Sequence, residues 1–339
     1  MTRRALTRRS FGALAGAAIL HAATPARAEV DTVRIPQGAG GIGFLPLLVM
    51  EKKGLIEQKA REMGFNLAVE WLRLGGPAMV NDLLISGQAD FAAAGPPAMI
   101  TVWARTIGNA NIKSVAAMTS IPMYLNTRSP TLNALHDLGP NDKIAVTAVK
   151  VSIPAIILQM AAVKEFGPSE YTRYDQYTVS MTHPDGVAAL LSGTEITSHF
   201  TSPPFNQRER KAPNIRRVMT SDDVMGGSTT FTMVYTTAKF HDANPKAYAA
   251  VLSTLKDVIA FINADKRAAA QIFLESSDAK GWKLEEILEI LNDPDVRFTT
   301  SPENVMKYAN FMADVGTIKT RPKTWQDMFF PEIHGIPGS

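Results

Sequence analysis

The sequence repeats one local pattern that determines its fold class: a short apolar run, then small residues, a proline and an amphipathic stretch. We therefore predict strands at residues 32–35, 67–72, 90–94 and 143–146, each followed by a helix that starts near Pro46, Pro77, Pro96 or Pro154. Proline is tolerated in the first turn of a helix, because its missing N–H would have no partner there. Strands that alternate with helices at this spacing indicate right-handed βαβ units and parallel sheets. The expected fold class is α/β.

A faint internal duplication points to two such units. Residues 84–91 lead to Gly95-Pro96-Pro97, and residues 190–196 lead to Ser202-Pro203-Pro204 with one residue more between. Two α/β lobes of similar construction would explain this, and chance similarity between two βα units is the alternative. From Asn244-Pro245 onward, apolar residues recur at helical spacing, so we expect an all-helical C-terminal portion packed around the first lobe.

Composition excludes several kinds of site. The 339 residues include no cysteine, which removes disulfides, thiolate metal sites, cysteine nucleophiles and lipid-modified cysteines. The formal charge is +3, but residues 1–28 hold five arginines and no acid, which leaves 30 basic against 32 acidic residues in the rest. A nucleic-acid partner is therefore not expected, because phosphate binding needs a clustered cationic face.

Residues 1–28 have the three parts of an export signal. The pair Arg8-Arg9 precedes Ser10-Phe11, an apolar stretch follows to Leu20, and Ala26-Arg27-Ala28 supplies small residues for cleavage near Ala28. The arginine pair resembles a twin-arginine signal, and an ordinary Sec leader is the alternative. The apolar stretch is shorter than the roughly 20 residues that span a bilayer. We expect an exported protein.

The glycine-rich segment at residues 38–43 fits G-x-G-x-x-G after a strand. Such a loop can let a dinucleotide pyrophosphate approach a helix N-terminus. Pro36 interrupts the strand, Pro46 starts the helix after the third glycine, and Glu70 is poorly placed to bind a ribose. An NAD(P) site on Gly38–Gly43 is therefore the minority interpretation.

No catalytic constellation is evident, because the six histidines are scattered without the i, i+4 spacing of a metal site. His199 is the most interesting of them, since it lies at the end of an expected strand. The loops at strand C-termini are rich in small and polar residues, and each leads into a helix N-terminus. Ligands bind at that edge in open α/β sheets, and helix N-termini favour anions by roughly 0.3–1 kcal/mol each. A chain with several such loops and no evident catalytic residues is more typical of a binding protein than of an enzyme.

The chain resembles the periplasmic substrate-binding proteins of ABC importers, in particular the nitrate/sulfonate/taurine group that also includes pyrimidine-precursor binders. The resemblance covers nearly all of the chain after the leader, and each motif is loose while their order is fairly specific. It rests on residues 43–47 and 53–55, 69–71 with 75–76, 84–91 with 95–97, 137–139 before 143–146, Asn244-Pro245, Gly316 and Trp325.

The resemblance implies a two-lobed, type II-like periplasmic-binding-protein fold with a two-segment hinge and a helical C-terminal portion. Lobe I would comprise residues 29–126 and 228–339, and lobe II residues 127–227, with crossings near 124–126 and 231–234. The family's ligand contacts would transfer to Gln37, Gly40, Gly41, Phe44, Gly75, Gly76, Gly95, Pro96, Lys150, Ser152, His199, Phe200 and Ser202. One departure is Ile196, which replaces the aspartate of the family's Gly-x-x-Asp motif, so ligand identity should not be copied from relatives.

The function that the resemblance implies is a periplasmic solute-binding component of an ABC importer. It would capture a small organic anion or a heteroaromatic (sulfonate, carboxylate or pyrimidine-like) by hinge closure, without enzymatic activity, cofactor or metal. Its partners would be this ligand and an ABC permease at the inner membrane, and we expect a monomer with no stable membrane anchor. The alternatives are an exported NAD(P)-dependent oxidoreductase and a pyrimidine-synthase-like enzyme on the same fold that uses His199 and a metal.

Overall fold

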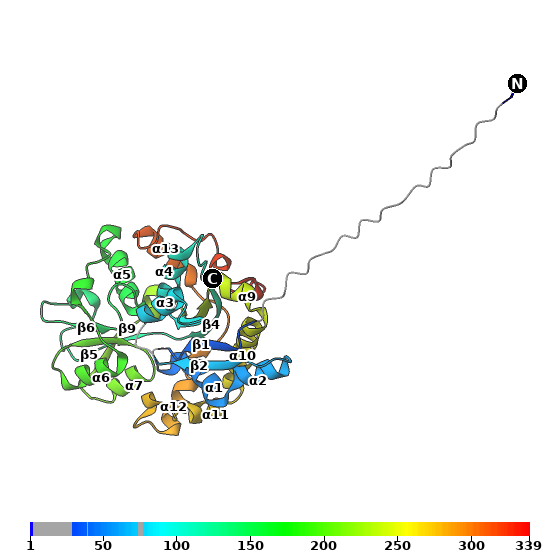
Figure 1. Ribbon diagram of the computed structural model, residues 1–339. Helices are drawn as coiled ribbons and strands as arrows, with labels where there is room; N and C mark the ends of the chain where they lie inside the picture. Colours follow the sequence, from blue (N-terminus) through cyan, green and yellow to red (C-terminus); the bar gives the residue numbers. More distant parts are fainter. Residues whose placement is uncertain (3–28, 39, 74–76) are drawn as a thin grey trace.

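The computed structural model describes residues 1–2, 29–38, 40–73 and 77–339 (Figure 1). The expected export signal, its cleavage site and the predicted contacts Gly75 and Gly76 lie outside the described residues. The described chain forms two groups of strands, each covered by helices. Figure 1 shows β5, β6 and β9 with α5, α6 and α7 at the left, and β1, β2 and β4 with α1, α2 and α10 at the right.

The first group of strands contains a parallel pair and a four-stranded sheet. The pair is β1 (Thr32–Pro36) and β2 (Ala68–Leu72), and the sheet has the order β11-β4-β10-β3, with β3 (Phe91–Ala94), β4 (Lys113–Ser120), β10 (Thr230–Thr236) and β11 (Arg297–Phe298). Arg34 and Asp90 connect the two. The Arg34 N–H donates to Asp90 Oδ2 over 2.8 Å, and the Asp90 N–H donates to the Arg34 carbonyl over 2.9 Å.

The second group is a five-stranded sheet of order β7-β6-β8-β5-β9. Its strands are β5 (Tyr124–Thr127), β6 (Ile144–Val146), β7 (Thr178–Ser180), β8 (Ser198–Thr201) and β9 (Arg216–Thr220). β6 is parallel to β7 and β8, whereas β5 is antiparallel to β8 and β9, and β10 is antiparallel to β3 and β4. The predicted parallel pairing is confirmed for β1 with β2 and for β6 with β7 and β8, whereas the other pairs are antiparallel, so the prediction of parallel sheets is correct only in part. β5 and β10 are the strands that the chain enters directly after it has crossed from one sheet to the other. They run in the opposite direction to their neighbours in each sheet.

Proline at the start of the helix is confirmed at the predicted positions for α1, α3, α4, α5 and α10, and α6 has Pro184 in its first turn as well. The helices are α1 (Leu45–Lys53), α2 (Leu55–Glu62), α3 (Pro77–Ser86), α4 (Pro96–Thr106), α5 (Ile153–Phe166), α6 (His183–Ser192), α7 (Phe205–Arg210), α8 (Ser221–Met225), α9 (Ala238–Ala243), α10 (Pro245–Ala264), α11 (Lys266–Phe273), α12 (Leu284–Asn292) and α13 (Val305–Asp314).

The C-terminal portion packs on the first group of strands, as predicted. α10 contacts α1, α2, α11 and β4, and α13 contacts α4. α10 is long and apolar enough to cross a membrane by composition, but 56% of its most apolar window is buried in this packing. It is the core helix of this lobe. One strand, β11, departs from the all-helical expectation, because it adds an edge to β4.

The chain passes between the two sheets at 121–123 and again at 221–229. The expected crossings at 124–126 and 231–234 fall instead inside β5 and β10, a few residues later in the chain. The two crossings are hydrogen-bonded to each other, since the Ser221 N–H donates to the Met123 carbonyl over 2.9 Å and the Met123 N–H donates to Ser221 Oγ over 3.0 Å. The lobe boundaries at 126/127 and 227/228 stay a prediction.

Candidate functional site

Two adjoining cavities lie where elements of the two sheets face each other, and they share four lining residues. Gly40 and Phe44 come from the segment between β1 and α1, whereas Thr147 follows β6 and His183 begins α6. Both cavities are therefore lined by the two groups of strands together. Most of this lining follows the carboxyl end of a strand, which is where open α/β sheets bind ligands.

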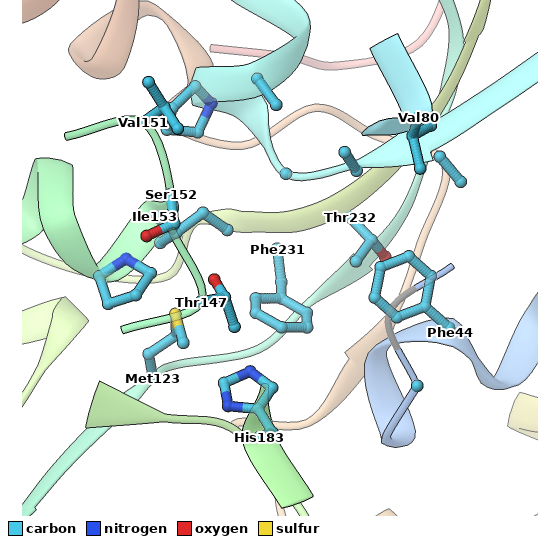
Figure 2. Close-up of a pocket in the computed structure, with 17 residues that line it drawn as sticks. Phe44, Val80, Met123, Thr147, Val151, Ser152, Ile153, His183, Phe231 and Thr232 are labelled. Atoms are coloured by element: carbon cyan, nitrogen blue, oxygen red, sulfur yellow. The ribbon is translucent and has the colours of Figure 1, made fainter. Parts of the chain in front are cut away.

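The first cavity is narrow and mostly apolar, with a volume of about 60 Å³. Figure 2 shows its side chains, including the rings of Phe44 and Phe231. Gly95, before α4, lies against Ile153 at the start of α5. A Cβ atom at Gly95 would be 2.4 Å from Ile153 Cδ1, so a larger residue here would require the Ile153 side chain or the lobes to move.

The second cavity is larger, about 350 Å³, and is polar on the side of the first lobe. Its charged lining residues in the described chain are Glu51 on α1 and Asp278, which lies in the turn after α11. The Gln37 amide donates from Nε2 to Glu51 Oε1 over 2.5 Å. The Ser276 hydroxyl also lines this cavity, and its buried oxygen has no hydrogen-bond partner among the described residues.

The glycine-rich segment holds one of the protein's own carboxylates. Gly38, Gly40 and Gly41 have positive φ values of 85°, 83° and 77°, a conformation that side chains disfavour. The Gly41 N–H donates to Asp278 Oδ2 over 2.7 Å, and a Cβ atom at Gly40 would be 2.3 Å from the same oxygen. The amide that a pyrophosphate would use is therefore occupied, which argues against the NAD(P) alternative.

The segment also contacts the second lobe. The Ile42 N–H donates to the carbonyl of Pro203 over 3.1 Å. Pro203 follows β8, the central strand of the five-stranded sheet. This backbone hydrogen bond joins the two lobes at the edge of the larger cavity.

The helix starts at the cleft supply fewer amide donors than expected. α4 begins with Pro96 and Pro97, α5 has Pro154 and α6 has Pro184 within the first two positions. Each proline removes one of the N–H groups that would otherwise bind an anion. The sequence-based expectation of amide-rich anion sites at these helix ends therefore needs correction, because the same prolines that start the helices remove the donors.

His183 is the histidine that faces the cavities. Figure 2 shows its imidazole directed into the first cavity, below Thr147 and Phe231. The ring stacks on Phe205 with 5.2 Å between the ring centres, and Nδ1 lies 2.9 Å from Thr201 Oγ1. Burial, with a smaller contribution from His199, lowers the pKa of His183 well below its usual value, so the ring is neutral at pH 7.

His199 lies behind His183 and does not line either cavity. Its Nε2 atom is 3.2 Å from His183 Nδ1, and its own Nδ1 is 2.5 Å from Glu209 Oε1. Asn126 donates to the other oxygen of Glu209 over 2.8 Å. All three side chains are buried. His199 can therefore hold His183 in place but does not itself reach the cavities, which corrects its expected direct contact.

The other sequence-predicted contacts divide into two groups. Gln37, Gly40, Gly41, Phe44, Gly95 and Ser152 line the cavities. Pro96, Lys150, Phe200 and Ser202 do not: Lys150 is exposed, and Phe200 and Ser202 are buried. Phe200 points into the core because strand residues alternate between faces. Ser202 accepts the N–H groups of Phe205 and Asn206 through its carbonyl.

Several lining residues were not predicted from the sequence, among them His183, Thr147, Asp278 and Phe231. His183 had a usable signal, because it occupies the first position of a helix that follows a strand. Asp278 had none, since it comes from the distant C-terminal portion. Among the described residues, no group of three or more His, Asp or Glu side chains is placed to hold a metal ion.

Comparison of the structure with solved structures shows the fold. The chain is similar to the alkanesulfonate-binding protein SsuA from Xanthomonas axonopodis pv. citri bound to MOPS, with a TM-score of 0.67, 15% identity, and coverage of 88% of this chain and 98% of that one. It is similar to a Candida albicans protein with the generic periplasmic binding protein fold, with a TM-score of 0.66, 14% identity, and coverage of 88% and 95%.

A third similar structure is the periplasmic nitrate-binding protein NrtA from Synechocystis, with a TM-score of 0.59, 18% identity, and coverage of 78% of this chain and 70% of that one. No protein-family model matches the sequence, and no curated protein matches it significantly. The chain has the periplasmic-binding-protein fold, as its sequence resemblance implied.

Proposed function

We propose that this chain, which has the periplasmic-binding-protein fold, is the solute-binding component of an ABC importer. One observation carries the proposal: Phe44 and Gly40 from one lobe meet Thr147 and His183 from the other around the same cavities. A molecule in this cleft would contact both lobes at once. It would therefore bind the closed arrangement of the lobes more tightly than an open one, and this difference in affinity drives closure.

The interlobe contacts support closure as the binding event. The Ile42–Pro203 hydrogen bond and the contact of Gly95 with Ile153 join the lobes directly at the cleft. In the described part of the chain, two segments connect the sheets, so the lobes can rotate about them without breaking either core. The proposed role needs binding and release but no covalent step.

The proposed location and partners follow from the leader and the fold. Residues 1–28 have the composition of an export signal, which would place the mature protein in the periplasm. There it would deliver its ligand to a permease at the inner membrane. Of the expected contacts, Gln37, Gly40, Gly41, Phe44, Gly95 and Ser152 remain proposed ligand-binding residues, and we add His183.

Thermal shift and small-angle X-ray scattering on the same samples test this proposal. A ligand at 100 times its dissociation constant should stabilise the fold by about 2.7 kcal/mol and reduce the radius of gyration. The screen should include organic acids, sulfonates, amines and nitrogen heterocycles. Phe44→Ala should abolish the shift, whereas Phe65→Ala, outside both cavities, should keep it. A ligand that stabilises the protein without compaction would contradict closure.

A further inference from the structure

The charges around the cleft are unusual for a site that holds an anion. Of the described residues that line the two cavities, Glu51 and Asp278 are the ones with a charged side chain, and both are acids. Residues 39 and 74–76, which lie outside the described residues, have no ionisable side chain in the sequence. Among the described residues, the lining therefore contains two carboxylates and no lysine or arginine to balance an anion.

Other sources of positive charge at the cleft are weak. His183 is held neutral by burial. Lys150, the cation expected to face the ligand, is exposed and outside both cavities. The helix ends that could bind an anion through N–H groups begin with Pro96-Pro97, Pro154 and Pro184.

The two carboxylates have acceptor capacity left. An ionised carboxylate has about four lone-pair positions. Asp278 uses Oδ2 for the Gly41 N–H, and Glu51 uses Oε1 for the Gln37 amide. Asp278 Oδ1 and Glu51 Oε2 have no donor from the described residues. The unpartnered Ser276 hydroxyl faces the same cavity, so a ligand there would meet three oxygen acceptors.

We propose that the ligand of this cleft is a small organic amine, whose ammonium group binds Asp278 and Glu51 in the larger cavity and whose apolar body enters the narrow cavity between Phe44 and Phe231. This inference rests on the proposed function and names its substrate class. Phe44 lines both cavities, so its ring can contact the ammonium group through a cation–π interaction as well as the apolar body.

Titration calorimetry with matched probes tests the charge preference. Benzylamine, benzoate and benzenesulfonate share one ring, and butylamine, butyrate and butanesulfonate share one chain. We expect the amine of each set to bind at least tenfold more tightly than its anions, as expected for a charge-assisted hydrogen bond. Tighter binding of an anion, or failure of both amines to bind at millimolar concentration, would overturn the proposal.

Two variants locate the ammonium site. Asp278→Asn keeps an acceptor for the Gly41 N–H, and Glu51→Gln keeps one for Gln37, so the loops should retain their structure. Each should weaken amine binding about tenfold and leave or improve anion binding. Glu285→Gln, an exposed acid on α12 that pairs with Arg267, is the matched control and should change nothing. Equal amine affinity in all three variants would overturn the assignment.

Scattering on the same samples separates the two proposals. If an anion binds and the protein becomes more compact, the receptor function is supported and an amine is excluded as the ligand class. If an amine binds in a way that depends on Asp278 but the protein does not become more compact, the amine is supported as the ligand class and closure of the lobes is contradicted.

Discussion

The ammonium group of Lys211 lies 4.3 Å from the centre of the Trp282 ring, and the two residues belong to different lobes. Lys211 follows α7 in the second lobe and also pairs with Glu286 on α12 over 2.5 Å. The guanidinium of Arg208 lies 5.1 Å from the same ring, and its Nη2 donates to the Lys280 carbonyl over 2.6 Å. One indole of the first lobe is thus contacted by two cations of the second.

The double variant Lys211→Met/Arg208→Met should weaken closure. Exposed cation–π contacts contribute about 0.5–1 kcal/mol each, so losing both costs about 1–2 kcal/mol. We expect weaker ligand binding and, in scattering, a larger radius of gyration for the ligand-bound protein. Arg267→Met, whose partner Glu285 lies in the same lobe, is the control and should leave the radius unchanged. An unchanged radius in the double variant would show that these contacts do not hold the lobes together.

Gly95→Ala should keep the lobes apart. The added methyl group would meet Ile153 Cδ1 at 2.4 Å and the Phe231 carbonyl at 3.1 Å. Because Ile153 can move away only by separating the lobes or by changing its rotamer, we expect a larger radius of gyration and at least tenfold weaker ligand binding, about 1.4 kcal/mol. Gly335→Ala has open space around it and should behave like the parent. Wild-type affinity in Gly95→Ala would contradict the close approach.

The buried His183 should make the protein less stable in mild acid. Its pKa is lowered by burial, while an unfolded histidine titrates near 6.5, so below pH 6.5 the unfolded state binds more protons. The free energy of unfolding should fall as pH decreases from 6.5 toward the folded-state pKa, by at most about 1.4 kcal/mol per pH unit. His183→Asn should show a shallower decline than the parent in chemical denaturation. Equal slopes in the variant and the parent would refute this origin.

His241 should affect the pH dependence of the free energy of unfolding in the opposite direction to His183. Burial opposes its charge, but hydrogen bonds with Asp242 (2.7 Å) and Glu332 (2.8 Å) outweigh burial and raise its pKa. A raised pKa stabilises the folded state below pH 6.5, and this stability is lost as pH rises through the folded value. The difference in unfolding free energy between the parent and His241→Gln should therefore shrink from pH 6 to pH 9. A difference that stays constant would contradict the ion-pair origin.

The sequence predicted the parts of the fold that local chemistry controls. Proline in the first turn identified the starts of α1, α3, α4 and α5, because that position needs no N–H. β5 and β10 were not predicted as strands, because crossings were expected at residues 124–126 and 231–234, and antiparallel pairing depends on where the chain returns after a crossing and not on the residues of the strand. The crossings themselves were placed a few residues late for the same reason.

The site was predictable in part. Gln37, Gly40 and Phe44 were expected from the family resemblance, and their position directly after β1 agrees with the rule that ligands bind at strand C-termini. Asp278 comes from residues that lie far away in the sequence, and no local pattern marks it. His199 looked like the ligand contact because it lies on a strand beside a Pro-Pro turn, yet alternation along β8 directs it to Glu209 and leaves the cavity to His183.

The paired crossings at Met123 and Ser221 set the centre about which one lobe can turn. Atoms near these two residues move little in any such rotation, and displacement grows with distance from them. A pair of spectroscopic labels placed on the two lobes far from Met123 and Ser221 would therefore convert a rotation of a few degrees into a readable change in separation.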